Sequence, residues 1–299
     1  MTKNKKLILN TALVLSLLSF LPNQVLSIPT NNSTNKYSGL YFAGNYKLDF
    51  PVLNKFSIKE TNFNTKQVIG LSKKREANTH DILSYHSAFN EPYTPKFQNI
   101  TSNFSGTIGY FYTNNLNFEV EVHYEKFDAE IPTGFIYADY IKDAYRYFAL
   151  ARETSSSISD ASLKTTPKYN NYVVMKNNGI SIISVMANNC YQFFTSQSNK
   201  ISSHICGGIG TDLIHFFDKL HTKLACQVKL GISYSPFSHY QLFANVYYHD
   251  VIGNNFNKLK TTHNVLGKNT KSIELDNISA TATLNINYFG SEVGLRFIL

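Results

Sequence analysis

The sequence predicts an all-β protein, a single antiparallel transmembrane β-barrel of eight strands with long extracellular loops. Three observations predict this fold. Stretches of about ten residues that alternate between apolar and polar side chains recur along the chain. The chain begins with a candidate export signal, and no later stretch has the roughly 18 consecutive apolar residues of a spanning helix. Such a chain is periplasmic, secreted or a closed barrel, and a barrel is the non-helical structure that satisfies every backbone group in lipid.

Residues 1–27 are predicted to be a secretory signal peptide. Residues 3–6 carry three lysines, residues 7–21 form an apolar run, and residues 25–27 resemble a cleavage site with small side chains. A retained membrane anchor is disfavoured, because this apolar run of about 15 residues is shorter than the roughly 20 needed to span a bilayer. We therefore expect the mature barrel domain to be residues 28–299.

The charge of the mature chain limits its partners only loosely. Removal of three signal lysines leaves 25 basic and 20 acidic side chains from the 28 and 20 of the whole chain, a surplus of five positive charges. This surplus favours anionic surfaces, but it does not by itself indicate nucleic acid.

The clearest strand pair lies at residues 104–128. Residues 116–125 alternate strictly between apolar and polar side chains, which is the period of a strand with one apolar face. A polar turn at residues 113–115 places Tyr110 opposite Phe118, so the apolar residues of both strands share a face. A soluble sandwich could contain the same hairpin. Its recurrence along an exported chain favours the membrane barrel.

The same alternation predicts the remaining strands and the segments between them. The eight expected strands are residues 40–48, the two strands of 104–128, 180–191, 201–210, 224–234, 240–248 and 291–299. The expected surface loops are residues 49–98, 130–176 and 253–282, with a small loop at 212–222 and a short helix within 135–152. Short turns alternate with longer loops, so both chain ends are expected on the periplasmic side.

The polar face of each strand is predicted to line the barrel lumen. Its principal charged residues are Lys47, Glu119, Glu121, Lys229, Glu292 and Arg296. Unpaired buried charges are costly, so we expect contacts of opposite sign among them. Four inward aromatic residues, Tyr41, Phe111, Phe243 and Tyr247, leave little room for water in a ring of eight strands.

The oxidising compartment permits a disulfide. Folding the connection 193–200 about Ser198 places Cys190 opposite Cys206, whereas Cys226 has lipid-facing parity in another hairpin. Directly opposed strand residues have Cβ atoms about 4.5–5.5 Å apart, which is somewhat wide for a disulfide. Cys190 and Cys206 are nevertheless the predicted pair.

Catalytic and cofactor motifs are missing from the sequence. It contains no HExxH, GxSxG, paired CxxC or phosphate-loop pattern. His123 lies among Glu119, Glu121 and Glu125, as in the site of an outer-membrane protease or acyltransferase, but the same residues also fill a barrel interior without catalysis. We therefore predict a protein that is not an enzyme and holds no metal or cofactor.

Several runs resemble the major outer-membrane surface-antigen family of ehrlichial and anaplasmal bacteria. These runs are EVEVHYEKFD at 119–128, YRYFAL at 145–150, HICGGIGTDL at 204–213, KLGISY at 229–234, HDVIGNNF at 249–256 and FGSEVGLRF at 289–297. The resemblance implies an abundant, immunodominant outer-membrane barrel, with porin activity in some members. Two departures are the unfamiliar loops at 49–98 and 253–282 and the final Leu299, where many outer-membrane proteins end in an aromatic residue.

Two functions therefore stay open. The first is a barrel surface antigen that admits small solutes, and the second is an adhesin whose long loops contact host cells. The expected partners are outer-membrane lipid and, at the loops, host surface molecules or antibodies, with no nucleic acid; the oligomeric state is undetermined. A filled eight-stranded lumen disagrees with porin activity unless the pore is small and intermittent, several chains assemble, or residues 62–73 or 171–177 add strands that widen the ring.

Overall fold

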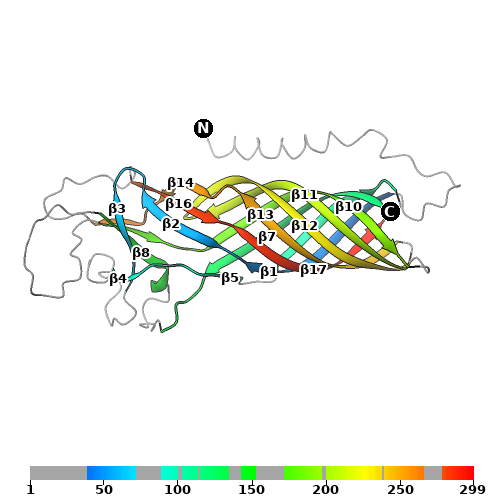
Figure 1. The fold of residues 1–299 in the computed structure, drawn as a ribbon, viewed down its shortest axis with the longest axis horizontal. Coiled ribbons are helices and arrows are strands. Elements are labelled where there is room, and N and C mark those ends of the chain that lie inside the picture. Colours follow the sequence, from blue (N-terminus) through cyan, green and yellow to red (C-terminus); the bar gives the residue numbers. More distant parts are fainter. Residues whose placement is uncertain are drawn as a thin grey trace, which may run out of the picture.

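The structure is a computed structural model that describes residues 39–71, 89–99, 103–113, 115–134, 143–152, 172–196, 200–237, 239–265 and 278–299. It is an elongated barrel that carries smaller sheets at one end (Figure 1). The predicted signal peptide at 1–27 lies outside the described residues.

Within the described part of the chain, no helix is both long enough and apolar enough to cross a membrane.

Eight antiparallel strands close the barrel, as the sequence predicts. They are β1 (Gly39–Pro51), β6 (Asn103–Phe111), β7 (Leu116–Ala129), β10 (Ile180–Thr195), β11 (Ile201–Phe216), β12 (Lys219–Phe237), β13 (Tyr240–Ile252) and β17 (Asn287–Ile298). Their order around the ring is β10-β11-β12-β13-β17-β1-β6-β7, and β7 pairs with β10 to complete it. The short strand β5 (Phe97–Asn99) pairs with the end of β7.

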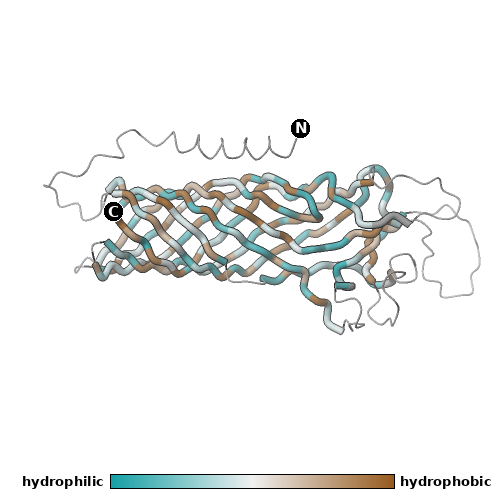
Figure 2. Tube along the Cα trace, turned by 180° about the vertical axis from the view of Figure 1, so that it is seen from behind, coloured by the Kyte–Doolittle hydropathy of each residue, from teal (hydrophilic) through white to brown (hydrophobic). Residues whose placement is uncertain are grey.

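The predicted faces of the strands are confirmed. In the β6–β7 hairpin Tyr110 pairs with Phe118 and Ile108 pairs with Val120, the register expected from the sequence. Val120 is 38% exposed on the outside of the barrel, whereas the next residue, Glu121, is fully buried inside it. Brown and teal residues alternate along the barrel strands in Figure 2, and the exposed apolar ones form the lipid-facing surface.

The prediction that residues 49–98 form an irregular surface loop is wrong. They contain the strands β2 (Asn54–Glu60), β3 (Thr65–Leu71), β4 (Phe89–Pro92) and most of β5. β2 pairs with β16 (Ser279–Asn285) and β3 pairs with β8 (Tyr147–Arg152), both distant in sequence. Because these pairings are non-local and the exposed positions are polar, the local pattern of the segment resembles that of a loop.

The helix expected within residues 135–152 is also corrected. Residues 147–152 form the strand β8 (Tyr147–Arg152), preceded by a single 3-10 turn at Ala144–Arg146, and residues 135–142 lie outside the described part. Phe148 and Leu150 are buried on one face of β8, while Ala149 and Ala151 are buried on the other. A strand that is buried on both faces shows no alternation, so its apolar residues matched helical spacing by coincidence.

The small loop expected at 212–222 is a two-residue turn. Strand β11 continues to Phe216 and β12 begins at Lys219, with Phe217 and Asp218 between them at φ of 46° and 54°. Positive φ at both central residues is the geometry of a tight hairpin turn. Alternation continues through Asp212 and Ile214, which are both buried.

The last predicted loop, residues 253–282, also contains strands. They are β14 (Asn255–Lys260), β15 (His263–Val265) and the first part of β16 (Ser279–Asn285). Strands β14, β16 and β2 form a three-stranded sheet that continues β13, β17 and β1 beyond the barrel. A second sheet, in the order β15-β9-β8-β3-β4, includes β9 (Tyr172–Lys176). Both sheets lie at one end of the barrel, opposite the C-terminus (Figure 1).

Candidate functional site

The middle of the lumen holds a cluster of four ionised side chains. Lys47 Nζ lies 2.8 Å from Glu121 Oε1 and 3.6 Å from Glu292 Oε2. Lys229 Nζ contacts the same two carboxylates, at 2.5 Å from Glu121 and 3.0 Å from Glu292. All four side chains are at most 2% exposed, so each charge depends on the others and on nearby amides rather than on water.

The other two predicted lumen charges lie nearer the end of the barrel that carries the C-terminus. Arg296 Nη2 lies 3.5 Å from Glu119 Oε2, and the Tyr41 hydroxyl donates a hydrogen bond of 2.8 Å to the same oxygen. The Arg296 guanidinium also lies 4.4 Å from the centre of the Tyr41 ring. The structure thus brings together all six charged residues singled out from the sequence, in two neighbouring groups.

Amide side chains complete this network. Asn45 donates to Glu292 Oε2, Asn245 donates to Glu292 Oε1, and Gln227 donates to Glu121 Oε2 and to Asn188. The sequence analysis did not select these residues, although their inward parity in β1, β10, β12 and β13 was the available signal. They satisfy carboxylate lone pairs that the lysines leave free.

A third polar group lies nearer the extracellular end, where His123 and Glu125, noted in the sequence, meet His249 and Asp212, which were not predicted. His249 Nε2 is 2.9 Å from Asp212 Oδ2, and His123 Nε2 is 3.1 Å from Glu125 Oε1. The ring of Tyr288 stacks on that of His249 with centroids 4.6 Å apart. Asp212 was missed because it was assigned to a loop, whereas it continues the inward parity of β11.

The suggestion that His123 belongs to a hydrolytic site is not favoured by its position. His123 is 2% exposed, and Glu121 and Glu125 beside it are fully buried. All three project into the closed interior of the barrel, so they contact one another and not an open cleft. Burial of this kind fits a packing role.

An apolar cap fills the extracellular mouth of the barrel. The barrel strands contribute Phe127, Ile180, Ile182, Ile214 and Phe216. The two extracellular sheets contribute Ile58, Phe148, Leu150, Val173, Met175, Phe256, Leu259, Ala280 and Ala282 to the same cluster. With the exception of Ile58, these side chains are fully buried, so the cap closes the polar lumen on this side.

Two arginine–carboxylate pairs tie β8 and the turn before it to the barrel and the neighbouring sheet. Arg146 donates to both carboxylate oxygens of Asp128 at the end of β7. Arg152 donates to both oxygens of Glu60 on β2, at 2.9 Å from Nε to Oε1 and 2.6 Å from Nη2 to Oε2. Bidentate arginine–carboxylate pairs are stronger and more directional than ion pairs with a single contact.

The pair between Asp128 and Arg146 predicts a loss of cap stability in acid. Asp128 lies beyond the lipid-facing Tyr124. Burial acts to raise the pKa of the Asp128 carboxyl, but the hydrogen bonds and the positive charge of Arg146 outweigh burial. The pKa of Asp128 is therefore below the usual 3.8. A lowered folded-state pKa gives stability that is present above the unfolded pKa and is lost as pH falls through the folded value. The protection factors of amide hydrogen exchange at residues 143–152 should therefore fall below about pH 4.

The Asp128→Asn variant is the control for this effect. Its protection factors at residues 143–152 should be lower at neutral pH and should not fall further between about pH 5 and pH 3. An acid response of equal size in both proteins would contradict the assignment to Asp128.

Cys190 and Cys206 form a disulfide inside the lumen. They are directly paired residues of β10 and β11, and both are nearly fully buried. Cys226 is the free cysteine and is half-buried on β12. Among the described residues, Glu119 with Cys190 and Cys206 is the one group of metal-ligating atoms close enough to share an ion, but the disulfide leaves it no thiolate.

Alkylation of the untreated, denatured protein should label one thiol, that of Cys226, and label three after reduction. Peptide mapping by mass spectrometry locates the label. Labelling of Cys190 or Cys206 before reduction would contradict the disulfide.

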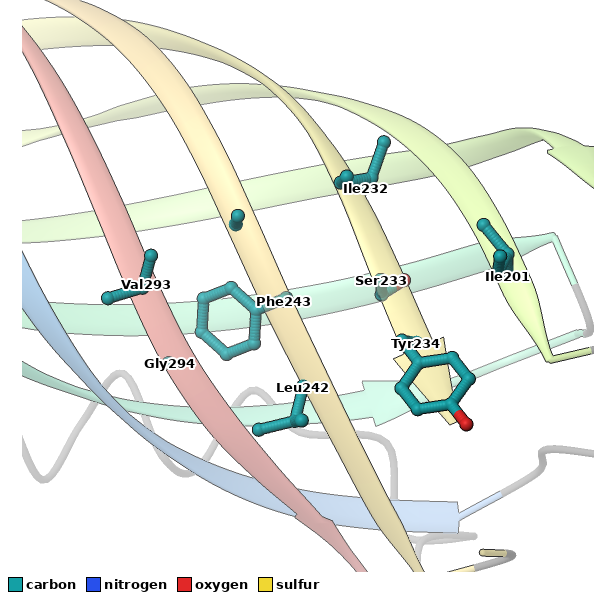
Figure 3. A pocket seen from close by; sticks show the side chains of 9 residues that line it. Ile201, Ile232, Ser233, Tyr234, Leu242, Phe243, Val293 and Gly294 are labelled. Carbon is teal, nitrogen blue, oxygen red and sulfur yellow. The ribbon is translucent and has the colours of Figure 1, made fainter. Parts of the chain in front are cut away.

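A shallow apolar hollow of about 560 Å³ lies in the barrel wall (Figure 3). It is formed mainly by β12, β13 and β17, through Ile232, Tyr234, Leu242 and Val293. It has no charged lining residue, so it offers lipid-compatible surface and no group for acid–base chemistry.

Comparisons with known sequences match most of the chain. The sequence profile of the family described as "Surface antigen" matches residues 32–299. The chain is 26% identical to Major surface antigen 4 of Anaplasma marginale over 260 residues, covering 86% of this chain and 83% of that protein.

Two solved outer-membrane structures are also similar. OprG of Pseudomonas aeruginosa has a TM-score of 0.46 at 11% identity, covering 90% of this chain and 99% of that one. Neisserial surface protein A has a TM-score of 0.38 at 12% identity, covering 88% and 98%.

Proposed function

Because the chain belongs to the surface antigen family, as an outer-membrane β-barrel exposed at the bacterial surface, we propose that it displays its extracellular sheets and loops and is not a wide diffusion pore. The observation that carries this proposal is the apolar cap. Water and ions cannot cross a continuous group of fully buried apolar side chains without displacing it.

The contents of the lumen support the same conclusion. The inward polar and charged residues below the cap are buried, and the four charges of Lys47, Glu121, Lys229 and Glu292 pair with one another. A barrel of eight strands has an interior that side chains fill. The strands within residues 62–73 and 171–177, which could have widened the ring, pair with β4, β8 and β15 in the sheet outside it.

A planar bilayer recording tests the proposal. The purified mature chain, inserted from detergent, should give silence or rare small steps of conductance. A general porin of about 16 strands, recorded under the same conditions, is the positive control for detecting conductance. Large and steady steps from the disulfide-intact protein would overturn the closed-lumen proposal and support passive porin activity.

Adhesion to host cells is the second candidate function, and the extracellular sheets favour it. In the part of the chain that the structure describes, the two extracellular sheets contain eight short strands, so they can present a fixed face. Binding of the purified chain to host cells, compared with a barrel that lacks these segments, tests this function. Equal binding by both proteins would exclude the extracellular sheets as the contact surface.

A non-enzymatic role follows from the same features. The histidines and carboxylates that would serve catalysis are buried in paired groups inside the barrel. A substrate reaching them would have to pass the cap or enter from the opposite end through the Arg296 and Tyr41 group.

A further inference from the structure

The outer face of the three-stranded extracellular sheet is basic and rich in hydroxyl groups. Strands β2, β14 and β16, all of whose residues the structure describes, contain four lysines: Lys55, Lys59, Lys258 and Lys260. All four are exposed. The one acidic residue in these strands, Glu60, is turned inward and is neutralised by Arg152. The sheet therefore presents positive charge without a compensating carboxylate of its own.

The register places two of these lysines on the same face as a row of hydroxyl groups. Lys59 is directly paired with Thr281, and Lys260 is directly paired with Ser279. Thr281 and Ser279 lie two residues apart on the central strand β16, so both point to one face. The two lysines flank β16 from opposite sides, and their strands are about 10 Å apart.

Exposed polar contacts continue along β2 and β16. Ser57 and Thr283 share a hydrogen bond of 2.7 Å, and Ser279 donates to Thr61 at 3.1 Å. Asn285 donates to Asn54 at 3.2 Å. Apart from Glu60, the inward residues of β2 and β16 are apolar, with Ile58, Ala280 and Ala282 in the cap and Leu284 packed in the same cluster. The polar face is thus held rigid by a packed core beneath it.

From this juxtaposition we infer that the outer face of β2, β14 and β16 binds an extended anionic polysaccharide. Ammonium groups bind sulfate or carboxylate groups, and the hydroxyls and amides exchange hydrogen bonds with sugar hydroxyls. A linear polymer matches a flat face whose donors recur along two neighbouring strands. The inference rests on the proposed surface display, because the sheet must lie outside the cell.

The height of the face above the membrane argues against lipid headgroups as the ligand. The lipid-facing wall of β1 ends at Phe50 and Val52, which are 63% and 41% exposed. Lys59 follows Val52 by seven residues, a strand path of about 23 Å, or about 17 Å along the barrel axis at a tilt of about 40°. A headgroup layer is about 5–8 Å thick on each side, so this lysine lies above it. The outward carboxylate of Asp250 on β13 lies closer to the membrane than this lysine does, next to the lipid-facing Tyr248.

Binding to heparin, a sulfated polysaccharide, tests the inference. The folded mature chain in zwitterionic micelles is titrated with heparin and, separately, with uncharged dextran of similar length. Heparin should bind with an affinity that falls as salt rises, because counterions are released, and dextran should not bind. Absence of heparin binding at low salt would overturn the inference.

The variant Lys59→Gln with Lys260→Gln removes two charges from the face. Its heparin affinity should fall about tenfold, and the slope of log Kd against log salt should decrease by about one to two. The matched control is Lys126→Gln with Lys200→Gln, which removes equal charge from β7 and from the turn at the other end of the barrel. The control should stay within about twofold of the parent protein.

An equal loss of affinity in both variants would show attraction to net charge and would overturn the assignment to this face. Circular dichroism and the unfolding midpoint establish that both variants are folded; Lys59, Lys260 and Lys200 are exposed and Lys126 is half-buried. Conductance is measured on the same preparations. A closed barrel that fails to bind heparin would reject this inference and leave the proposed closed-lumen function intact.

Discussion

Replacement of Glu121 by glutamine is expected to destabilise the folded barrel by about 3–5 kcal/mol, the cost of breaking a buried ion pair. Glu121 contacts Lys47 and Lys229 in the middle of the lumen, and all three side chains are essentially inaccessible to water. The variant would leave two buried ammonium groups sharing one carboxylate, that of Glu292. Unfolding in urea from phospholipid vesicles measures the change.

Tyrosine fluorescence and circular dichroism are the suitable signals, because the chain has 20 tyrosines and no tryptophan. Glu130→Gln is the matched control, since Glu130 is exposed beyond the end of β7, and its stability should change by less than about 0.5 kcal/mol. The double variant Glu121→Gln with Lys229→Met should be less destabilised than the sum of its single variants, because it removes both members of a pair. Additive losses would indicate that the two residues do not interact.

The Phe148→Ala variant should loosen the apolar cap, with a local cost of about 3–5 kcal/mol. Phe148 is fully buried, its ring stacks on Tyr93 with centroids 4.1 Å apart, and it contacts Phe217 edge-on at 5.7 Å. Truncation leaves a void between β8 and the mouth of the barrel. Hydrogen exchange of β8 and β9 should accelerate, while exchange of the lower half of β1 and β17 should not change.

The cap variant also tests whether the cap closes the lumen. Small conductance steps should become more frequent in Phe148→Ala than in the parent chain, because the cap opens more often. Leu150→Met is the matched control in the same strand: it is also fully buried, but it conserves volume and should cost less than about 1.5 kcal/mol. Unchanged exchange and unchanged conductance in Phe148→Ala would contradict the role assigned to the cap.

Whether a strand could be predicted from the sequence depended on whether its two faces contact different environments. Strands such as β7 separate a lipid face from a polar lumen, so Val120 and Glu121 differ in chemistry and the alternation is visible in the sequence. Strand β8 separates two apolar clusters, so Phe148 and Ala149 do not differ in this way. The continuation of β11 through Asp212 was missed for another reason, since the polar residues at 215–223 resemble a loop although the strand ends in a tight turn.

The sequence by itself determined the barrel: the number of its strands, the face of each strand, and the charged residues inside it. It could do so because lipid requires apolar side chains at every second position, and because short turns join four of the eight strand pairs of the barrel, such as β6 and β7. The tertiary structure decided which charges meet, such as Lys47 and Glu121 across the lumen. It also decided that the extracellular segments fold into sheets whose apolar faces close the mouth of the barrel. Those contacts join residues far apart in the sequence, such as Ser57 and Thr283 at a separation of 226 and Asn45 and Glu292 at 247, and no local pattern encodes them.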